Sequence, residues 1–173
     1  MANDFYLHLI DTKTGVVKGE ATDAAFTEEI QLSGFTIEID GPDLDAAGSA
    51  DSGHCVFHEL QLKAPASVAS SVLFYLCCTG EIVKQATITC RKAGGGKVQP
   101  FIQWRFHRAQ ISYYKQEPAE GGVLDSFNLK FSKVEMGYFK QKPDGSFETS
   151  PRTAGWDQDQ NASLKTTLPH PKK

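Results

Sequence analysis

One short stretch of the sequence has the residue types of a metal site. His54, Cys55 and His58 stand close together, and Cys77-Cys78 adds two further thiols. Zinc needs ligands that converge on one point. In an extended strand Cys55 points away from His54 and His58, so we expect a half-buried, hydrogen-bonded His58 and structural thiols. The sequence therefore predicts no metal site and no cofactor.

A glycine-rich stretch with basic flanks is the second candidate for chemistry. Arg91-Lys92-Ala93-Gly94-Gly95-Gly96-Lys97 is similar to a phosphate-binding loop at first sight. It lacks the Gly-Lys-Ser/Thr order of such loops, and it leads into a strand pattern rather than a helix that could hold an anion. We therefore expect a hairpin turn. No Ser/His/Asp arrangement stands out elsewhere, so the sequence predicts no catalytic residues and no enzyme.

The composition excludes several classes of protein. The chain has 173 residues and a formal net charge of -3. This length suits one globular domain, and the mild negative charge argues against binding to nucleic acid. The longest apolar stretch, residues 68–78, is too short to span a bilayer, so no membrane insertion is expected. The first residues lack the basic and apolar regions of a signal peptide, which predicts a protein made in the cytoplasm.

Alternating apolar and polar residues dominate the chain, which is typical of antiparallel β structure. In three places the alternation slips by one residue: at Ser33-Gly34, after Phe106 and after Phe131. Strands that change faces midway are typical of sheets that bend around corners. The sequence therefore predicts a mainly β fold, a bent antiparallel β-barrel or two packed sheets.

One segment has helical spacing instead. Over residues 65–79, apolar side chains recur every three or four positions. Ser67 is a candidate N-cap, and Gly80 can end the helix in the left-handed conformation. We therefore expect one α-helix over about 65–79, at the side of the sheet. The apolar positions are Val68, Val72, Tyr75 and Leu76.

The chain divides simply into a domain, a loop and a tail. We expect a single β-barrel domain over residues 1–165 and a disordered tail over residues 166–173. Residues 41–53 are small and acidic, and such a long loop is expected to be the most mobile internal segment.

Polar side chains alternate with the apolar rows on several predicted strands. Such rows are the ordinary solvated surface of half-buried strands. They would also suit the wall of a channel made by several subunits, because they mix both charges with short neutral groups. The sequence leaves both interpretations open. The rows are Thr36, Glu38 and Asp40; Gln85, Thr87, Thr89 and Arg91; Gln103, Arg105 and His107; and Ser126, Asn128 and Lys130.

Several motifs occur in a characteristic order along the chain. They are Asp4-Phe5-Tyr6-Leu7, Lys18-Gly19-Glu20-Ala21-Thr22-Asp23, Glu28-Glu29-Ile30, Cys77-Cys78-Thr79-Gly80, Arg91-Lys92-Ala93-Gly94-Gly95, and Gly155-Trp156-Asp157 with Asn161. On these motifs the chain resembles, over essentially its whole length, the haemolysin-coregulated protein (Hcp) family. Members of this family are the tube subunits of type VI secretion systems.

The resemblance implies a structural role without catalysis. It implies an Hcp-like β-barrel with one helix, six copies in a ring, and rings stacked into a tube inside a contractile sheath. Contraction expels the tube, its spike and bound effectors, so the implied partners are sheath, spike and effector proteins. Secretion would then need no signal peptide. Thr36 matches the family's lumen-facing position used in effector binding, and alternation places Glu38 on the same side.

A second class of function stays open at this point. A monomeric β-barrel could bind a small ligand in its interior. This hypothesis requires polar groups among the inward-facing residues to orient the ligand, but the inward positions carry apolar side chains. Those positions are Ile102, Trp104, Phe106, Phe127, Leu129 and Phe131. A tube subunit is therefore the favoured interpretation.

Overall fold

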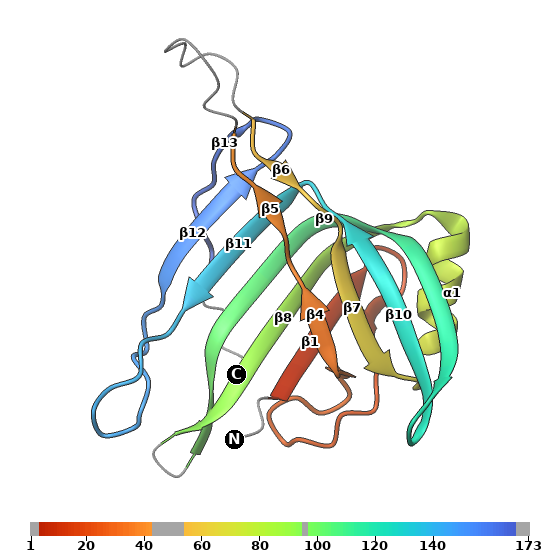
Figure 1. Ribbon diagram of the computed structural model, residues 1–173, viewed down its shortest axis with the longest axis horizontal. Coiled ribbons are helices and arrows are strands. Elements are labelled where there is room, and N and C mark those ends of the chain that lie inside the picture. Colours follow the sequence, from red (N-terminus) through yellow and green to blue (C-terminus); the bar gives the residue numbers. More distant parts are fainter. Residues whose placement is uncertain (1–3, 43–53, 95–96, 169–173) are drawn as a thin grey trace.

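The computed structural model describes residues 4–42, 54–94 and 97–168 (Figure 1). Within these ranges the chain is mainly β, with one helix, and nearly all of its strands pair antiparallel in one bent sheet. The predicted mobile loop over residues 41–53 lies almost wholly outside the described residues. The strands are β1 (Asp4–Asp11), β2 (Gly15–Val17), β3 (Ile30–Leu32), β4 (Gly34–Thr36), β5 (Ile39–Asp40), β6 (Val56–Phe57), β7 (Leu60–Pro65), β8 (Ile82–Gly94), β9 (Lys97–Ala119), β10 (Gly122–Lys130), β11 (Lys133–Tyr138), β12 (Arg152–Asp157) and β13 (Ala162–Ser163).

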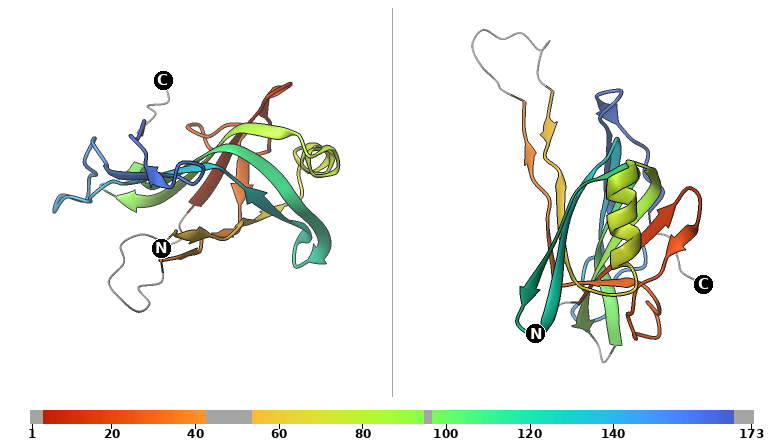
Figure 2. Two further views of the ribbon diagram at one scale, coloured as in Figure 1. Left: turned by 90° about the horizontal axis from the view of Figure 1, so that it is seen from above. Right: turned by 90° about the vertical axis from the view of Figure 1, so that its right-hand side faces the viewer.

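The longest strand, β9, organises the sheet. Its first half pairs with β8 along one edge and with β11 along the other, and its second half pairs with β10. Beyond these neighbours, β8 pairs with β1, β10 with β7, and β11 with β12. The two-stranded ribbon of β5 and β6 projects from the body of the sheet (Figure 2).

At the first predicted face change, Ser33-Gly34, the chain leaves one part of the sheet and joins another. β3 pairs with β1, whereas β4 pairs with β7, and only Ser33 separates them. The Ser33 amide donates a hydrogen bond to the Lys63 carbonyl at 2.8 Å. The two flanks of the sheet therefore meet at Ser33, which gives the sheet its bent, barrel-like form.

The other two face changes lie next to each other. Arg108, in the middle of β9, has a φ of 49°, which is rare for a residue with a side chain. Phe131 and Ser132 separate β10 from β11, and the Ser132 amide donates to the His107 carbonyl at 3.2 Å. Adjacent strands therefore bend at the same level, as the alternation of the sequence predicts.

The helix is shorter than predicted. Helix α1 spans Ser70–Thr79, and Pro65 ends β7 instead of opening the helix. Ser67 is not the N-cap, because Ala69 occupies that position. The predicted end is confirmed: Gly80 has a φ of 66°, and its amide bonds to the Leu76 carbonyl at 3.0 Å. Within the described ranges no helix is long and apolar enough to cross a membrane.

A single large cluster of apolar side chains fills the space enclosed by the bent sheet. Leu73 and Leu76 of α1 close one side of it. The inward positions of the long strands contribute fully buried residues such as Phe106, Phe127 and Leu129. Three of the predicted inward residues, Ile102, Trp104 and Phe131, are only partly buried and pack against this cluster.

The segment after β13 is packed on the sheet as far as residue 168. Leu168 is 8% exposed, and the Thr167 amide donates a hydrogen bond to Glu135 Oε2 at 2.7 Å. The predicted disorder from residue 166 onwards therefore does not hold for residues 166–168. Residues 169–173 lie outside the described ranges.

The helix and the last strands lie at opposite sides of the molecule. In Figure 1, α1 is at the right and β12 and β13 are at the left, and the view from above in Figure 2 shows the same separation. The ribbon of β5 and β6 lies over the side that carries β11 and β12.

Candidate functional site

The predicted site residue Thr36 lies on an exposed polar surface. We call the outward side chains of β4, β7, β10 and the second half of β9 the exposed polar face. Strand register places Thr36 opposite Gln61, Gln61 opposite Asn128, and Asn128 opposite Tyr113. Glu38 follows β4 and is exposed as well. The face comprises Thr36, Glu59, Gln61, Lys63, Ser112, Tyr113, Lys115, Ser126, Asn128 and Lys130.

Charges on the exposed polar face are mixed and locally paired. Glu59 accepts hydrogen bonds from Ser112 Oγ at 2.8 Å and from Asn128 Nδ2 at 3.1 Å, and Lys130 Nζ lies 3.5 Å away. Partial burial raises the pKa of Glu59, but these hydrogen bonds and the Lys130 charge outweigh it, so the pKa is lowered overall. Tyr113 is the one aromatic ring on the face. The surface is therefore hydrophilic without a strong net field.

A second set of polar rows, on β8, β9 and β11, is buried. We call the side chains of Thr87, Thr89, Gln103, Arg105 and Glu135 the buried polar face; each is 8% exposed or less. The sequence placed four of these residues on a solvated surface or channel wall, and that prediction is wrong for them. They are covered by chain from other regions.

The C-terminal segment covers Arg105 and Glu135. Arg105 and Glu135 lie opposite each other on β9 and β11 and are each 1% exposed. Arg105 donates to Thr167 Oγ1 at 2.8 Å, and His107 Nε2 lies 2.7 Å from Glu135 Oε1. Burial alone would raise the pKa of Glu135. Hydrogen bonds from the Thr167 amide and His107 and the charge of Arg105 outweigh this effect, so the pKa is lowered overall and the carboxylate stays ionised.

Most of the early motif residues form one closed loop, residues 18–29. The Gly19 amide donates to the Glu28 carbonyl at 2.7 Å, and Lys18 Nζ lies 3.1 Å from Glu28 Oε2. A Cβ on Gly19 would lie 2.4 Å from the Glu29 carbonyl oxygen, so only glycine fits there. Glu20 accepts a hydrogen bond from the Val68 amide at 3.0 Å, which ties the loop to the start of the helical region.

Arg91 holds the same loop against the sheet. Its guanidinium lies 2.7 Å from Asp23 Oδ2, 4.8 Å from the Phe26 ring centre and 5.6 Å from that of Tyr6. The Arg91 hydrogen bond is the main cause of the lowered pKa of Asp23. Glu29, also in the loop, is buried with Oε1 3.4 Å from His8 Nδ1. These motif residues are therefore packing residues of the fold.

The later motif residues also act in packing. Gly155 lies where the C-terminal segment crosses β12, and a Cβ there would be 2.9 Å from the Leu164 carbonyl oxygen. Asn161 adopts the left-handed φ of 45° in the β12–β13 turn. Lys92 Nζ lies 5.2 Å from the Phe101 ring centre. Gly94 ends β8, as the predicted hairpin requires, and Gly95 is outside the described residues.

The potential metal ligands His54, Cys55 and His58 do not form a metal site among the described residues. His58 is more exposed than predicted, and its Nε2 lies 2.8 Å from Asp40 Oδ2, which raises the pKa of His58. No group of three potential metal-ligating side chains occurs in the part of the chain that the structure describes. The four cysteines are free; Cys90 is buried, with its thiol pKa raised to about 12 by burial, whereas Cys78 is exposed.

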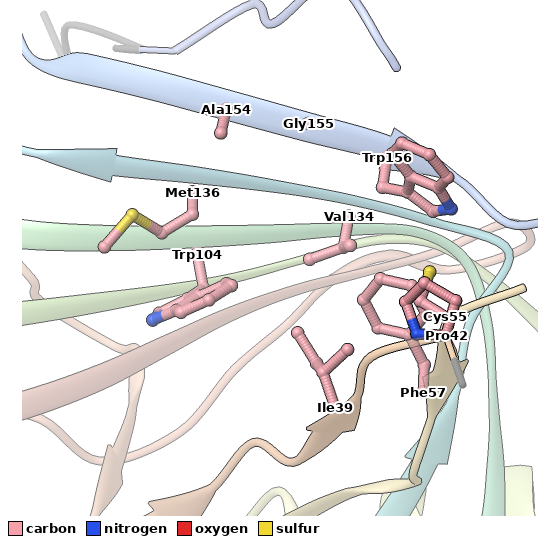
Figure 3. A pocket seen from close by; sticks show the side chains of 10 residues that line it. All are labelled: Ile39, Pro42, Cys55, Phe57, Trp104, Val134, Met136, Ala154, Gly155 and Trp156. Carbon is pink, nitrogen blue, oxygen red and sulfur yellow. The ribbon is translucent and has the colours of Figure 1, made fainter. Parts of the chain in front are cut away.

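An apolar pocket, which the sequence did not indicate, lies beside the core. It has a volume of about 550 Å³ and opens between the β5–β6 ribbon and the inner face of β9, β11 and β12. Figure 3 shows Trp104, Met136 and Trp156 along the strands, and Ile39 and Phe57 facing them from the ribbon. Pro42, Cys55, Val134, Ala154 and Gly155 complete the lining.

Comparisons with known proteins agree on one family. Residues 6–138 match the family described as "Type VI secretion system effector, Hcp". Protein hcp1 of Pseudomonas aeruginosa is 26% identical over 164 residues, which cover 93% of this chain and 98% of that protein. Among solved structures, a type six secretion system protein matches with a TM-score of 0.82 at 21% identity, covering 94% of this chain and all of that one. Hcp1 from Salmonella typhimurium matches with a TM-score of 0.73 at 22% identity, covering 95% of this chain and all of that one.

Proposed function

Because the chain belongs to the Hcp family of type VI secretion system proteins, we propose that it is a structural subunit of the secretion tube. Six copies form a ring, rings stack into a tube inside the sheath, and effectors travel in the channel. Contraction of the sheath expels the tube with its spike, so a subunit made in the cytoplasm reaches the extracellular space or a target cell. The chain has no catalytic role in this process.

The observation that carries this proposal is the exposed polar face. Its side chains are mostly polar and of both charges, with Tyr113 as an aromatic ring and with apolar neighbours at one end of β10, where Leu124 lies opposite Pro65. Such a wall would let a folded cargo move without sticking, because few apolar groups would be left to bind it. We assign Thr36 and Glu38 to the channel side of the subunit.

The ring is tested by the mass and shape of the purified protein. Light scattering after size-exclusion chromatography should give the mass of six copies, and negative-stain images should show hollow rings. A monomer that persists at high protein concentration would contradict the proposal.

The channel assignment is tested by cargo stabilisation. Thr36→Gln should leave the rings intact and change the cellular level of a co-expressed effector of the same secretion system. Thr22→Gln, on the exposed surface of loop 18–29, is the matched control and should leave that level unchanged. Intact rings with an unchanged effector level for Thr36→Gln would exclude this residue from the cargo surface.

The alternative of a monomeric barrel that binds a small ligand in its interior has less support. Phe106, Phe127 and Leu129 fill the centre of the fold and are fully buried. The apolar pocket lies at the side of this core, and its lining carries no set of polar groups that would orient a ligand.

A further inference from the structure

The outward stripe of helix α1 is unusual for a surface helix. Ser71, Phe74, Tyr75 and Cys78 face away from the core, and Phe74 and Tyr75 are 57% and 55% exposed. The ten residues of α1 include no charged side chain. Solvent-facing stripes of helices normally carry charged and polar residues, and helices that are apolar on all sides are buried. This stripe therefore has the composition of a covered surface.

The apolar pocket at the other side of the molecule has the opposite shape. It is a hollow, lined by Trp104, Met136, Trp156 and seven further residues, without a single charged side chain (Figure 3). The ribbon covers it only in part, since Ile39, which lines the pocket from the ribbon, remains 44% exposed. The inward-facing side chains of β9, β11 and β12 that line the pocket are therefore not fully covered by the rest of the sheet.

We propose that Phe74 and Tyr75 of one copy of this chain insert into the apolar pocket of the next copy. This inference rests on the proposed function, and it names the contact that joins neighbours within a ring. Helix α1 and the strands β11 and β12, which form one wall of the pocket, lie at opposite sides of the molecule (Figures 1 and 2). A contact between two different surfaces of identical subunits is head-to-tail, and it repeats until the rotation closes a ring.

The chemistry favours a second copy over a small molecule as occupant. Every copy carries both halves of the contact in equal number, so no unmatched apolar surface is left within a closed ring. Two aromatic side chains held on a rigid helix lose little conformational freedom on binding and bury large areas, as is typical of interface hot spots. The pocket offers them two tryptophans, Phe57 and Met136 as contact partners.

Native cysteines provide a direct test. Cys78 lies on the helix stripe and Cys55 lines the pocket, so the proposed contact brings one thiol from each of two copies together. The test uses the full chain with Cys77→Ser, because Cys77 is next to Cys78 and partly exposed. A short bis-maleimide should convert this protein into a ladder from dimers upward. Neither Cys55→Ser nor Cys78→Ser added to this background should cross-link alone, whereas a mixture of the two should give dimers only.

Other patterns of cross-linking would overturn the proposal. Cross-linking of the Cys78→Ser protein by itself would indicate a symmetrical contact between two pockets. Absence of cross-links in protein that images as hollow rings would leave the tube function in place and exclude this contact. Absence of rings altogether would contradict the proposed function as well, so the two failures are distinguishable.

A charge on the helix stripe gives an independent test. Phe74→Lys should weaken ring formation by about tenfold or more, as expected for loss of an aromatic hot spot. Val16→Lys is the matched control, because Val16 is 49% exposed on β2 and belongs neither to the helix stripe nor to the pocket lining; it should form rings like the unchanged chain. The dye 8-anilinonaphthalene-1-sulfonate, whose fluorescence rises on apolar surfaces, should be released from the pocket as rings form. Normal rings of Phe74→Lys, or dye that stays bound in full rings, would contradict the contact.

Discussion

The exposed polar face and the buried polar face are built from similar residues, yet only one meets solvent. Both lie on strands of the same bent sheet, and both carry threonine, glutamine and paired charges. Within the described residues, the polar side chains of β4, β7 and β10 are exposed or half-buried. On β9 and β11, the C-terminal segment lies against Arg105 and Glu135 and bonds to both through Thr167.

The difference shows that the same polar alternation serves two purposes. Where the row is open, each charge is solvated and contributes little to stability. Where the row is covered, each polar group needs a partner within the protein, and losing one leaves its partner unsatisfied. Equivalent substitutions should therefore lower the free energy of unfolding more on the buried polar face than on the exposed polar face.

The largest effect is expected at buried Glu135. Glu135→Ala removes the carboxylate that the Thr167 amide, His107 and the charge of buried Arg105 face, and should lower the free energy of unfolding by about 3 kcal/mol or more. Glu59→Ala removes an ion pair from the exposed polar face and should cost about 0–1 kcal/mol. Urea denaturation at equal protein concentration measures both. Equal losses for the two variants would contradict the contrast between the faces.

The next largest change in stability is expected at one of two glycines, Gly155, which lies opposite Glu135, and not at Gly34, which lies opposite Lys63. Gly155→Ala forces a methyl group toward the Leu164 carbonyl oxygen and should destabilise the fold by about 1–3 kcal/mol. Gly34, in β4 on the exposed polar face, has no atom within 4 Å of the position of a Cβ. Gly34→Ala should change stability by about 0.5 kcal/mol or less. A harmless Gly155→Ala would mean that the C-terminal segment does not press on β12.

Features of the fold that depend on neighbouring residues could be predicted from the sequence, whereas contacts between residues far apart in the chain could not. Alternation is local, so it predicted the strands and the three face changes, and Gly80 predicted the end of α1. The start of α1 was placed too early because Pro65 also suits the end of a strand. What covers a strand is not local. Thr167 lies 62 residues from Arg105 in the chain, and alternation around Arg105 shows only which side it faces.

Some of the missed features left a weaker trace in the sequence. Gly137 and Gly155 interrupt strand patterns, and glycine in a strand often marks a close approach of another segment. At both positions that segment is residues 164–168. The site residue Thr36 was assigned from the family resemblance and Glu38 from strand alternation, and the structure shows that both are exposed. The apolar pocket had no sequence signal, because its two walls come from the ribbon and from strands far apart in the chain.

A dependence on pH should also separate the faces. The folded-state pKa of Glu135 is lowered from its ordinary value of 4.5. Its contribution to stability is therefore complete above that value and is lost as the pH falls through the lower folded-state pKa. The fall in unfolding free energy below about pH 5 should be shallower for Glu135→Gln than for the unchanged chain. Glu59→Gln should alter this slope less, because Glu59 is partly exposed. Identical slopes for all three proteins would contradict the role of the buried carboxylate.

The smallest effect on stability is expected at Thr36. Its side chain is exposed on β4, so Thr36→Gln should change the free energy of unfolding by about 0.5 kcal/mol or less. A loss of several kcal/mol would show that the exposed polar face is covered within the single chain. Any change in cargo handling by this variant can then be assigned to the surface and not to unfolding.

We propose that the exposed polar face lines the channel of a ring made from this chain. A cryo-electron microscopy reconstruction of the purified protein would show which face of the sheet forms the inner wall. We expect hollow six-membered rings with β4, β7 and β10 on the inner wall and Thr36 facing the channel. A particle that remains a monomer, or a ring whose channel is lined by another face of the sheet, would contradict the claim.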